Sequence, residues 1–394
     1  MATASPTSAL PRRPALTNVD QDPGAAWRYV DWVLVLAVAA IAGIGALMIF
    51  SATRGRRGAD TIDPFFLERQ GLYVVIGLGL MAFTAAIDYR RLRELAPFIY
   101  ATTLFLLFAV LTPLGSNRRG AQAWFTLPSG FQLQPSEFAK LGVIIMLASY
   151  CGVSTSSREL VPMGPRRVAK ALALATAPLA LILLQPDLGT ALVFGAVTVA
   201  VLSVSGTQGR YLLLLAVLVV GISAGVLKSG VLQDYQKDRL TTFLDPTKGT
   251  RDAAFNLNQS KIAIGSGGIA GKGIFEGTQT KLRYVPEQHT DFIFSVVGEE
   301  TGLLGSSLLL ALFGVVMWRT WRAAAMANDS VGTLICVGVL AMLCFQLLEN
   351  VGMTMGIMPI TGITLPFVSF GGSSTLACFG AVGLVLNVHM RRFS

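Results

Sequence analysis

The chain consists largely of apolar runs, most of them near the roughly 20 residues that a helix needs to cross a bilayer. Charged residues make up only 13% of the 394 residues, whereas an ordinary soluble domain carries about 25%. A soluble fold of this length could not bury so much apolar surface, so we expect an all-α, polytopic membrane protein. Ten runs qualify, two of them marginally: 30–51, 68–88, 95–113, 136–151, 168–185, 187–205, 210–228, 291–317, 331–358 and 364–389.

The basic residues indicate how these helices are oriented. Cytoplasmic loops of membrane proteins carry an excess of Lys and Arg. With the N-terminus inside, fifteen basic residues fall in cytoplasmic segments and six in short outer loops. We therefore expect both termini in the cytoplasm, and the long loop 229–290, between the seventh and eighth helices, on the outer side of the membrane. Loops of this length are usually functional or disordered.

The remaining composition limits the domains and partners. Residues 1–29 are polar and lack the apolar stretch of a signal peptide. We expect them to form a disordered cytoplasmic tail, and residues 30–391 to form a single ten-helix domain that includes loop 229–290. The net charge of +9 is spread between the apolar runs, which predicts no nucleic-acid partner. The four cysteines lie in or at the end of apolar runs, without disulfide or metal-ligand spacing.

A polar loop that ends in His289, Thr290 and Asp291 runs directly into the eighth apolar run. A carboxylate at this boundary is partly desolvated, which raises its pKa toward the range of a general base. The alternative is a helix N-cap, a role that Asp fills well, and the spacing leaves both open. Small residues that allow close packing share one face of a helix beginning at Asp291: Ser295, Gly298, Gly302 and Gly305.

The fourth apolar run opens with a second group of polar residues. Ser136 is a natural N-cap, and Glu137 favours the positive end of a helix. Glu137 and Lys140 are three residues apart and therefore share a face. One interpretation is a capped helix with a local ion pair. The other is a buried pair in which Lys140 faces an anionic substrate.

Polar residues also interrupt later runs. Gln346, Glu349 and Asn350 share one face of the ninth helix. An intramembrane carboxylate indicates a functional site, although a structural polar clamp is the alternative. Asp187 is expected to cap the helix after a tight hairpin, with a functional role as the alternative. The stretch 369–374 breaks the last helix, and exposed backbone of this kind is tolerated where it lines a cavity.

Four stretches are similar to the motifs of one family. They are Q-P-S-E-F-A-K at 134–140, Q-S-K-I-A-I-G-S-G-G at 259–268, P-E-Q-H-T-D-F-I-F at 286–294 and L-P-F-V-S-F-G-G-S-S at 365–374. Together they resemble the SEDS family (shape, elongation, division and sporulation), bacterial membrane glycosyltransferases that polymerise lipid II. The resemblance covers essentially all of residues 30–390.

Three further features resemble the RodA branch of the family, the rod shape-determining proteins, more than the FtsW branch. They are Lys261, the G-T-Q stretch at 277–279 and the P-I-T-G-I-T stretch at 359–364. This resemblance implies a role in cell elongation and rod shape.

Two positions depart from the family pattern. The family often has an arginine before the tryptophan that is Trp124 here, where this chain has Ala123, and another basic residue where Gln132 stands. Arg118 and Arg119 are the candidates to supply the missing charge.

The resemblance assigns Asp291 as the essential catalytic carboxylate of an inverting reaction. The 4-hydroxyl of the acceptor's N-acetylglucosamine attacks C1 of the donor's N-acetylmuramic acid, and undecaprenyl pyrophosphate leaves. Lys140, oriented by Glu137, is the candidate to stabilise the departing pyrophosphate. A divalent cation, Mg²⁺ or Mn²⁺, could share that role, but the sequence shows no ligand cluster that demands one. The other substrate-binding candidates are His289, Thr290, Glu349 and Ser373.

The expected partners follow from the same resemblance. They are lipid II, the growing glycan strand, a class B penicillin-binding protein that cross-links the glycan, other membrane proteins of the elongation complex, and membrane lipids. The alternative function is a lipid II flippase or other transporter. Transporters commonly contain inverted repeats, and this chain shows none. A third alternative, a scaffold that recruits the penicillin-binding protein, would not need Asp291.

Overall fold

The computed structural model of the chain describes residues 27–54, 65–118, 121–126, 131–152, 163–217, 243, 251–282, 284–285 and 287–392. Most of the tail 1–29 lies outside these residues, and so do residues 218–228 of the predicted seventh helix and residues 229–242 and 244–250 of the long loop. The disorder of the tail therefore stays a prediction.

Nine helices in the described part of the chain match nine of the ten predicted runs. They are α2 (Trp32–Thr53), α3 (Phe65–Ala86), α4 (Tyr89–Ala109), α5 (Pro135–Cys151), α6 (Pro165–Leu184), α7 (Leu188–Val204), α12 (Ile293–Met326), α13 (Ser330–Met355) and α14 (Gly372–Met390). Seven of the described helices are long and apolar enough to cross a membrane, while α5 and α7 have 17 residues each. The helical, multi-pass membrane architecture is confirmed. The total of ten helices and the extent of the long loop stay predictions.

Aspartates begin four of these helices. Asp31, Asp88, Asp187 and Asp329 each accept a hydrogen bond from an amide of the first turn of α2, α4, α7 and α13, respectively. These amides have no partner within their own helix. The caps therefore explain where four apolar runs become helical, and they confirm the capping role predicted for Asp187.

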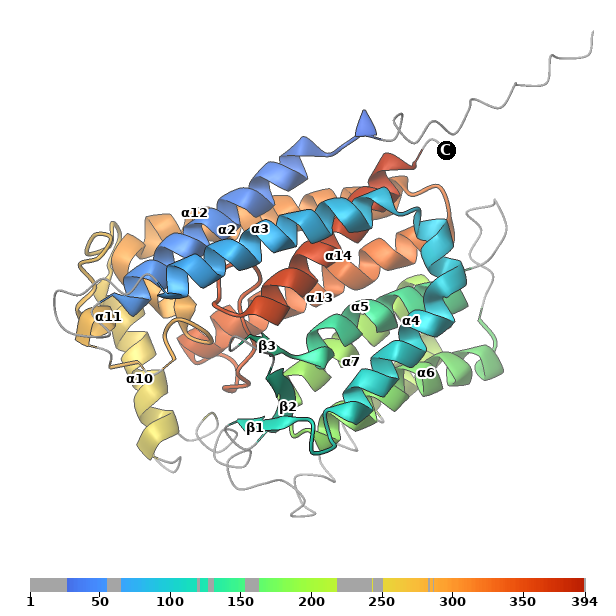
Figure 1. Cartoon of the computed structure of the whole chain (residues 1–394), viewed down its shortest axis with the longest axis horizontal. Helices are drawn as coiled ribbons and strands as arrows, with labels where there is room; N and C mark the ends of the chain where they lie inside the picture. The colour runs from blue at the N-terminus through green and yellow to red at the C-terminus, as the bar shows by residue number, and fades with distance from the viewer. Residues whose placement is uncertain are drawn as a thin grey trace, which may run out of the picture.

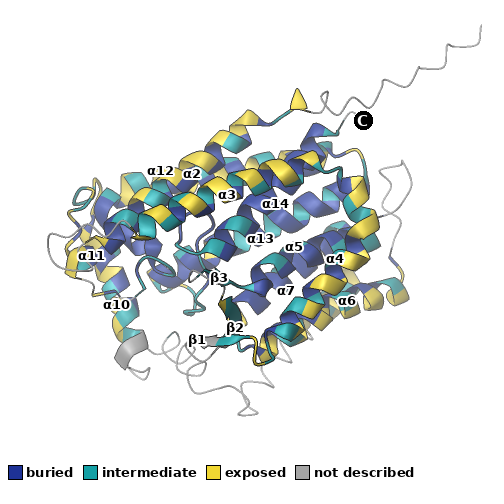
Figure 2. Ribbon diagram, viewed as in Figure 1, coloured by how far each residue is buried: buried dark blue, intermediate teal, exposed yellow. Residues whose placement is uncertain are grey.

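α14 forms the centre of the bundle (Figure 1). Of its apolar stretch, 94% is buried, and it packs against α3 along much of its length. α12 contacts α2 and α13, whereas α4 to α7 gather on the other side. The outer helices keep exposed faces (Figure 2), and on α4 these faces carry large apolar side chains such as Phe98 and Phe105. Exposed apolar surface of this kind marks an interaction site, here the lipid.

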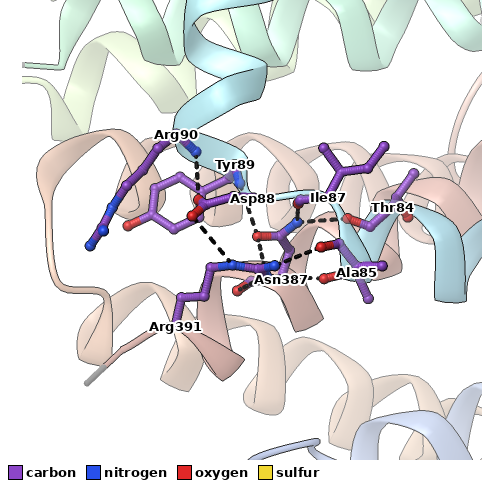
Figure 3. Close-up of polar contacts among 9 residues, drawn as sticks. Thr84, Ala85, Ile87, Asp88, Tyr89, Arg90, Asn387 and Arg391 are labelled. Atoms are coloured by element: carbon purple, nitrogen blue, oxygen red, sulfur yellow. Dashed lines mark hydrogen bonds and ion pairs between the residues drawn. The ribbon is translucent and has the colours of Figure 1, made fainter. Parts of the chain in front are cut away.

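The end of α14 is held by the turn between α3 and α4 (Figure 3). The Asn387 side chain donates to the carbonyls of Thr84 (2.6 Å) and Ile87. Arg391 donates to the carbonyl of Ala85 (3.0 Å). These carbonyls lie in the last turn of α3 or just after it, where helix carbonyls lack intrahelical partners. These contacts fix the position of α14 along its own axis. They therefore also fix the position of its N-terminal end, at Gly372.

A small sheet departs from the all-α prediction. Three antiparallel strands, β1 (Ser116–Arg118), β2 (Ala121–Thr126) and β3 (Gln132–Leu133), lie between α4 and α5 in the order β1-β2-β3. Phe125 pairs with Leu133. The segment is too short and too polar to qualify as a membrane-spanning run, so its hydropathy does not predict a structural element.

α12 is not the continuous helix that the eighth run predicts. Gly302 has φ 64° and ψ −160°, which breaks the helix. Loop 267–273 occupies the break. Its amides donate to the carbonyls of Glu299 and Glu300 (3.1 and 3.0 Å), and the amides of the two residues after Gly302 donate to loop carbonyls (2.9 and 3.1 Å). The freed backbone groups are therefore satisfied by protein, as membrane depth requires.

Glu299 anchors the segment that follows this loop. This segment contains α11 (Thr278–Leu282) and comes after α10 (Arg251–Ser266). The fully buried Glu299 carboxylate accepts from Lys272 Nζ (2.8 Å) and from the amides of Gln279 (2.8 Å) and Thr280 (2.9 Å). Gln288 Nε2 in turn donates to the Thr280 carbonyl (3.0 Å). The anchored segment thus holds the residue immediately before His289.

We expect Gly271→Ala to destabilise the protein clearly. Gly271 has φ +80°, and an added Cβ would lie 2.1 Å from the Glu300 carbonyl oxygen. The conformation alone costs about 1–3 kcal/mol for a residue with a side chain, and the overlap with backbone adds to this. Gly265→Ala is the matched control, because Gly265 is helical and no atom lies within 4 Å of an added Cβ. Thermal unfolding in detergent should show a lower Tm for Gly271→Ala only; equal Tm values would contradict the packing of this loop.

Candidate active site

A pocket of about 730 Å³ opens where α3, α5, α7, α13 and the start of α14 meet the segment before α12. Six of the seven predicted site residues line it: Glu137, Lys140, His289, Thr290, Asp291 and Ser373. They come from three stretches far apart in the sequence, so the fold brings together residues that the sequence could place only singly.

Asp291 lies at the pocket wall, before the start of α12. The N-cap of α12 is Phe292, and no side chain caps this helix. The alternative in which Asp291 is the N-cap of this helix is therefore wrong. The cause is a turn in which the Thr290 and Phe292 amides donate to the Glu287 carbonyl (3.1 and 3.4 Å), which moves the helix start downstream. The Asp291 carboxylate remains at the pocket instead.

Glu137 and Lys140 form the buried pair that the sequence predicted as one alternative. Lys140 Nζ lies 2.8 Å from Glu137 Oε2, and the side chains are only 2% and 8% exposed. Both line the pocket. The capping role predicted for Ser136 is wrong, because α5 begins at Pro135 with Gln134 as its N-cap. Pro is favoured at the first helical position, where its missing N–H costs nothing.

Asp187 also reaches the pocket from the turn between α6 and α7. Its carboxylate accepts from the Thr190 amide (2.9 Å), the Thr190 hydroxyl (2.8 Å) and Gln134 Nε2 (3.2 Å). Burial raises the pKa of this carboxyl, and the Thr190 bonds oppose that shift. Asp187 therefore caps α7 and, through Gln134, connects it to the start of α5.

Arg69 is a pocket residue that sequence reasoning missed. Its guanidinium lies 4.3 Å from the ring centroid of Phe65 and 5.2 Å from that of Phe131. The sequence counted Arg69 only as one of the outer-loop charges. The available signal was spacing, since Phe65 and Tyr73 lie four residues to either side and share its helix face. Arg69 adds a cation, held by aromatic rings, to a pocket that already contains Lys140.

Ser373 connects the start of α14 to the sheet. Its hydroxyl accepts from the Gln134 amide (2.9 Å) and donates to the Gln132 carbonyl (3.2 Å). The predicted break before the last helix is present, and residues 370–374 line the pocket. Substrate binding by Ser373 stays a prediction, because its described contacts are with the protein backbone.

The polar face of α13 meets the pocket through a different residue from the one predicted. Gln346 lines the pocket, whereas Glu349 does not and accepts from the Thr361 hydroxyl (2.9 Å). Asn350 Nδ2 donates to the Asp291 carbonyl (2.8 Å). Helical spacing correctly placed the three on one face, but it could not show which of them faces the pocket.

The structure describes the two positions that depart from the family pattern, but not the two arginine side chains that are the candidates to replace the missing charge. Gln132 and Trp124 line the pocket, and Ala123 is buried beside them in β2. The side chains of Arg118 and Arg119 lie outside the described residues. Their role in replacing the missing charge stays a prediction.

No group of three or more His, Cys, Asp or Glu side chains that could hold a metal ion occurs among the described residues. The Mg²⁺ or Mn²⁺ considered from the sequence is therefore not assigned to a set of ligands.

Comparison with known proteins identifies the family. The model of the FtsW/RodA/SpoVE family, described as cell cycle protein, matches residues 31–393. The chain belongs to this family. The SEDS resemblance drawn from the four motifs is thereby confirmed.

Relatives match over nearly the whole chain. A probable peptidoglycan glycosyltransferase FtsW of Geobacter metallireducens is 37% identical over 363 residues, which cover 92% of this chain and 95% of that protein. Peptidoglycan glycosyltransferase MrdB of Escherichia coli K12 is 36% identical over 364 residues, covering 92% and 94%. The relatives named FtsW and MrdB match at similar identity, so these matches do not assign the chain to one branch of the family. The RodA-like assignment therefore stays a prediction.

Solved structures share the fold. The crystal structure of the Thermus thermophilus rod shape determining protein RodA has a TM-score of 0.68 at 34% identity, covering 93% of this chain and 99% of that one. A chain from "Structural coordination of polymerization and crosslinking by a peptidoglycan synthase complex" reaches 0.76 at 33% identity, with the same coverage. The helical fold of this SEDS chain is therefore that of solved members.

Proposed function

We propose that this SEDS chain is a peptidoglycan glycosyltransferase that polymerises lipid II at the outer leaflet of the cytoplasmic membrane, for cell elongation and rod shape. The observation that carries the proposal is one pocket that contains both Asp291 and the buried Glu137–Lys140 pair. The names of the relatives, peptidoglycan glycosyltransferases, support the same reaction class.

Asp291 acts as the general base. Its carboxylate takes the proton of the acceptor's 4-hydroxyl as that oxygen attacks C1 of the donor's N-acetylmuramic acid. The bond from C1 to the pyrophosphate oxygen breaks on the opposite face, and its electron pair leaves with undecaprenyl pyrophosphate. The configuration at C1 is therefore inverted. A base positioned at the reacting hydroxyl contributes about 10²–10⁴-fold.

Lys140 and Arg69 stabilise the leaving group. Negative charge grows on the bridging oxygen as the bond to C1 breaks, and fixed cations in a site shielded from water stabilise such charge strongly. Glu137 holds the Lys140 ammonium at 2.8 Å. The rings of Phe65 and Phe131 hold the Arg69 guanidinium. Both cations are positioned before substrate arrives.

The membrane placement and the partner complete the proposal. Both termini lie in the cytoplasm, which places the segment with Asp291 on the outer side, where the glycan grows. A class B penicillin-binding protein cross-links the product. The similarity to a chain of a peptidoglycan synthase complex that coordinates polymerization and crosslinking supports this partner.

The experiment that tests the proposal uses the purified chain, alone and with a class B penicillin-binding protein, mixed with lipid II in detergent. We expect glycan strands, measured by their length on a gel. Absence of polymer with the partner present, together with transfer of lipid II between leaflets in proteoliposomes, would establish the flippase alternative instead.

We expect Arg69→Gln to lower kcat/KM for lipid II by about tenfold or more, because hydrogen bonds to charged groups contribute about 1.5–3 kcal/mol. Arg54→Gln is the matched control, since Arg54 also stacks on a phenylalanine ring, Phe275 (5.1 Å), but does not line the pocket. Initial rates at several lipid II concentrations separate KM from kcat. An unchanged kcat/KM for Arg69→Gln would remove this arginine from the substrate site.

A further inference from the structure

The backbone that carries Asp291 is held by three hydrogen bonds from other segments. The carbonyls of residues 289–291 each accept one bond. Their donors, in order, are the Phe370 amide (2.9 Å), the Ser369 hydroxyl (2.7 Å) and Asn350 Nδ2 (2.8 Å). Three successive carbonyls bonded in this way leave the peptide little freedom, so the position of Asp291 is set from outside its own segment.

Asn350 differs from the other two donors because its side chain donates to two carbonyls. Its Nδ2 also donates to the Ile363 carbonyl at 2.8 Å, and the side chain is fully buried in α13. Two carbonyls can only accept, so the amide must present its NH₂ group to them. Because Asp291 and Ile363 both line the pocket, one side chain connects two stretches of the pocket wall to a long, largely buried helix.

The other two donors serve the connection between α13 and α14. Phe370 contributes a main-chain amide, which a substitution does not remove. The Ser369 hydroxyl also accepts from the Leu365 amide (2.8 Å), so it holds the 365–369 turn. Asn350 makes no bond to the 365–369 turn, so its loss acts on Asp291 without removing a bond that holds this turn.

We propose that Asn350 is a positioning residue for Asp291, which sets the reach of the carboxylate to the acceptor hydroxyl. The inference rests on the proposed function. A general base must lie about 2.6–3.2 Å from the atom whose proton it takes. Misplacement by about 1 Å can cost about 10²-fold in rate, even when the changed residue does not touch substrate.

Asn350→Leu tests this role, because leucine has the same branched shape, with methyl groups in place of the amide oxygen and nitrogen, and no donor. We expect kcat for lipid II polymerisation to fall about a hundredfold, since catalysis depends on base placement, while KM changes less than about threefold. The pH dependence of kcat should also shift, because the carboxylate that titrates is the one displaced. A residue that only supported the fold would lower the amount of active protein and leave kcat and the pH profile of the remaining, correctly folded enzyme unchanged.

The control is Ser260→Ala. Ser260 is fully buried and donates to the Thr354 carbonyl of α13 (2.8 Å), but it does not line the pocket. It should lower Tm with kcat retained. An equal loss of kcat in Ser260→Ala would overturn the proposal, because loosening α13 anywhere would then suffice.

Asn350→Gln tests the positioning role if Asn350→Leu does not fold. It keeps the amide but adds one methylene, which moves the Asp291 carbonyl relative to α13, so kcat should fall about tenfold. Wild-type kcat and pH profile in either folded variant would overturn the proposal. Failure of the proposed function is a distinct result, since the wild-type chain would then make no polymer at all.

Discussion

Asp291→Asn is expected to lower the rate of lipid II polymerisation by about 10²–10⁴-fold, the usual contribution of a general base. The carboxamide has the same shape but cannot accept the hydroxyl proton. Folding should be retained, because Phe292 and not Asp291 stands at the N-cap of α12, and lipid II should still bind. Measurements of kcat, of lipid II affinity and of Tm separate these effects.

The sharpest control for this variant is Glu287→Gln, because Glu287 lines the same pocket in the same segment as Asp291. We expect Glu287→Gln to retain most activity. If Asp291→Asn polymerises normally and Glu287→Gln does not, the base is Glu287, and the reaction stands while the assignment of Asp291 fails.

Lys140→Met is expected to lower kcat by about 10²–10³-fold, the range measured for removal of one group that stabilises developing charge. It should also destabilise the fold, because it leaves the Glu137 carboxylate buried without its 2.8 Å partner. Breaking a buried ion pair in this way typically costs about 3–5 kcal/mol. Polymerisation kinetics and Tm measure the two effects separately.

The double variant Glu137→Met with Lys140→Met separates catalysis from stability. Replacing both charges by apolar side chains of similar size is often neutral for stability, so Tm should recover toward the wild-type value. Turnover should stay low, because the cation at the leaving group is absent. Wild-type turnover in the double variant would show that the pair is structural.

Much of the fold could be predicted because it depends on local composition. Apolar runs specify membrane helices, and the observed ends differ from the predicted ones by only a few residues in most cases, as at α2 and α13. The break at Gly302 could not be predicted, because the bonds that stabilise it come from loop 267–273. The strands between α4 and α5 also depend on pairing between segments.

The candidate site likewise combines features that the sequence predicted with features that depend on contacts between segments. Spacing along one helix predicted the contact between Glu137 and Lys140, because both lie on the same turn of α5. Spacing could not show that Gln346 rather than Glu349 faces the pocket, or that Arg69 joins it. These facts depend on how separate helices face each other, which helical phase within one segment does not determine.

The most direct test of the central claim, that lipid II reacts in this pocket, is a cryo-EM structure of Asp291→Asn with lipid II bound. We expect sugar density against residue 291, with a ring hydroxyl within hydrogen-bond distance of the new carboxamide, and pyrophosphate density against the Lys140 ammonium. Lipid II density outside the pocket, with the space between these two residues empty, would contradict the account.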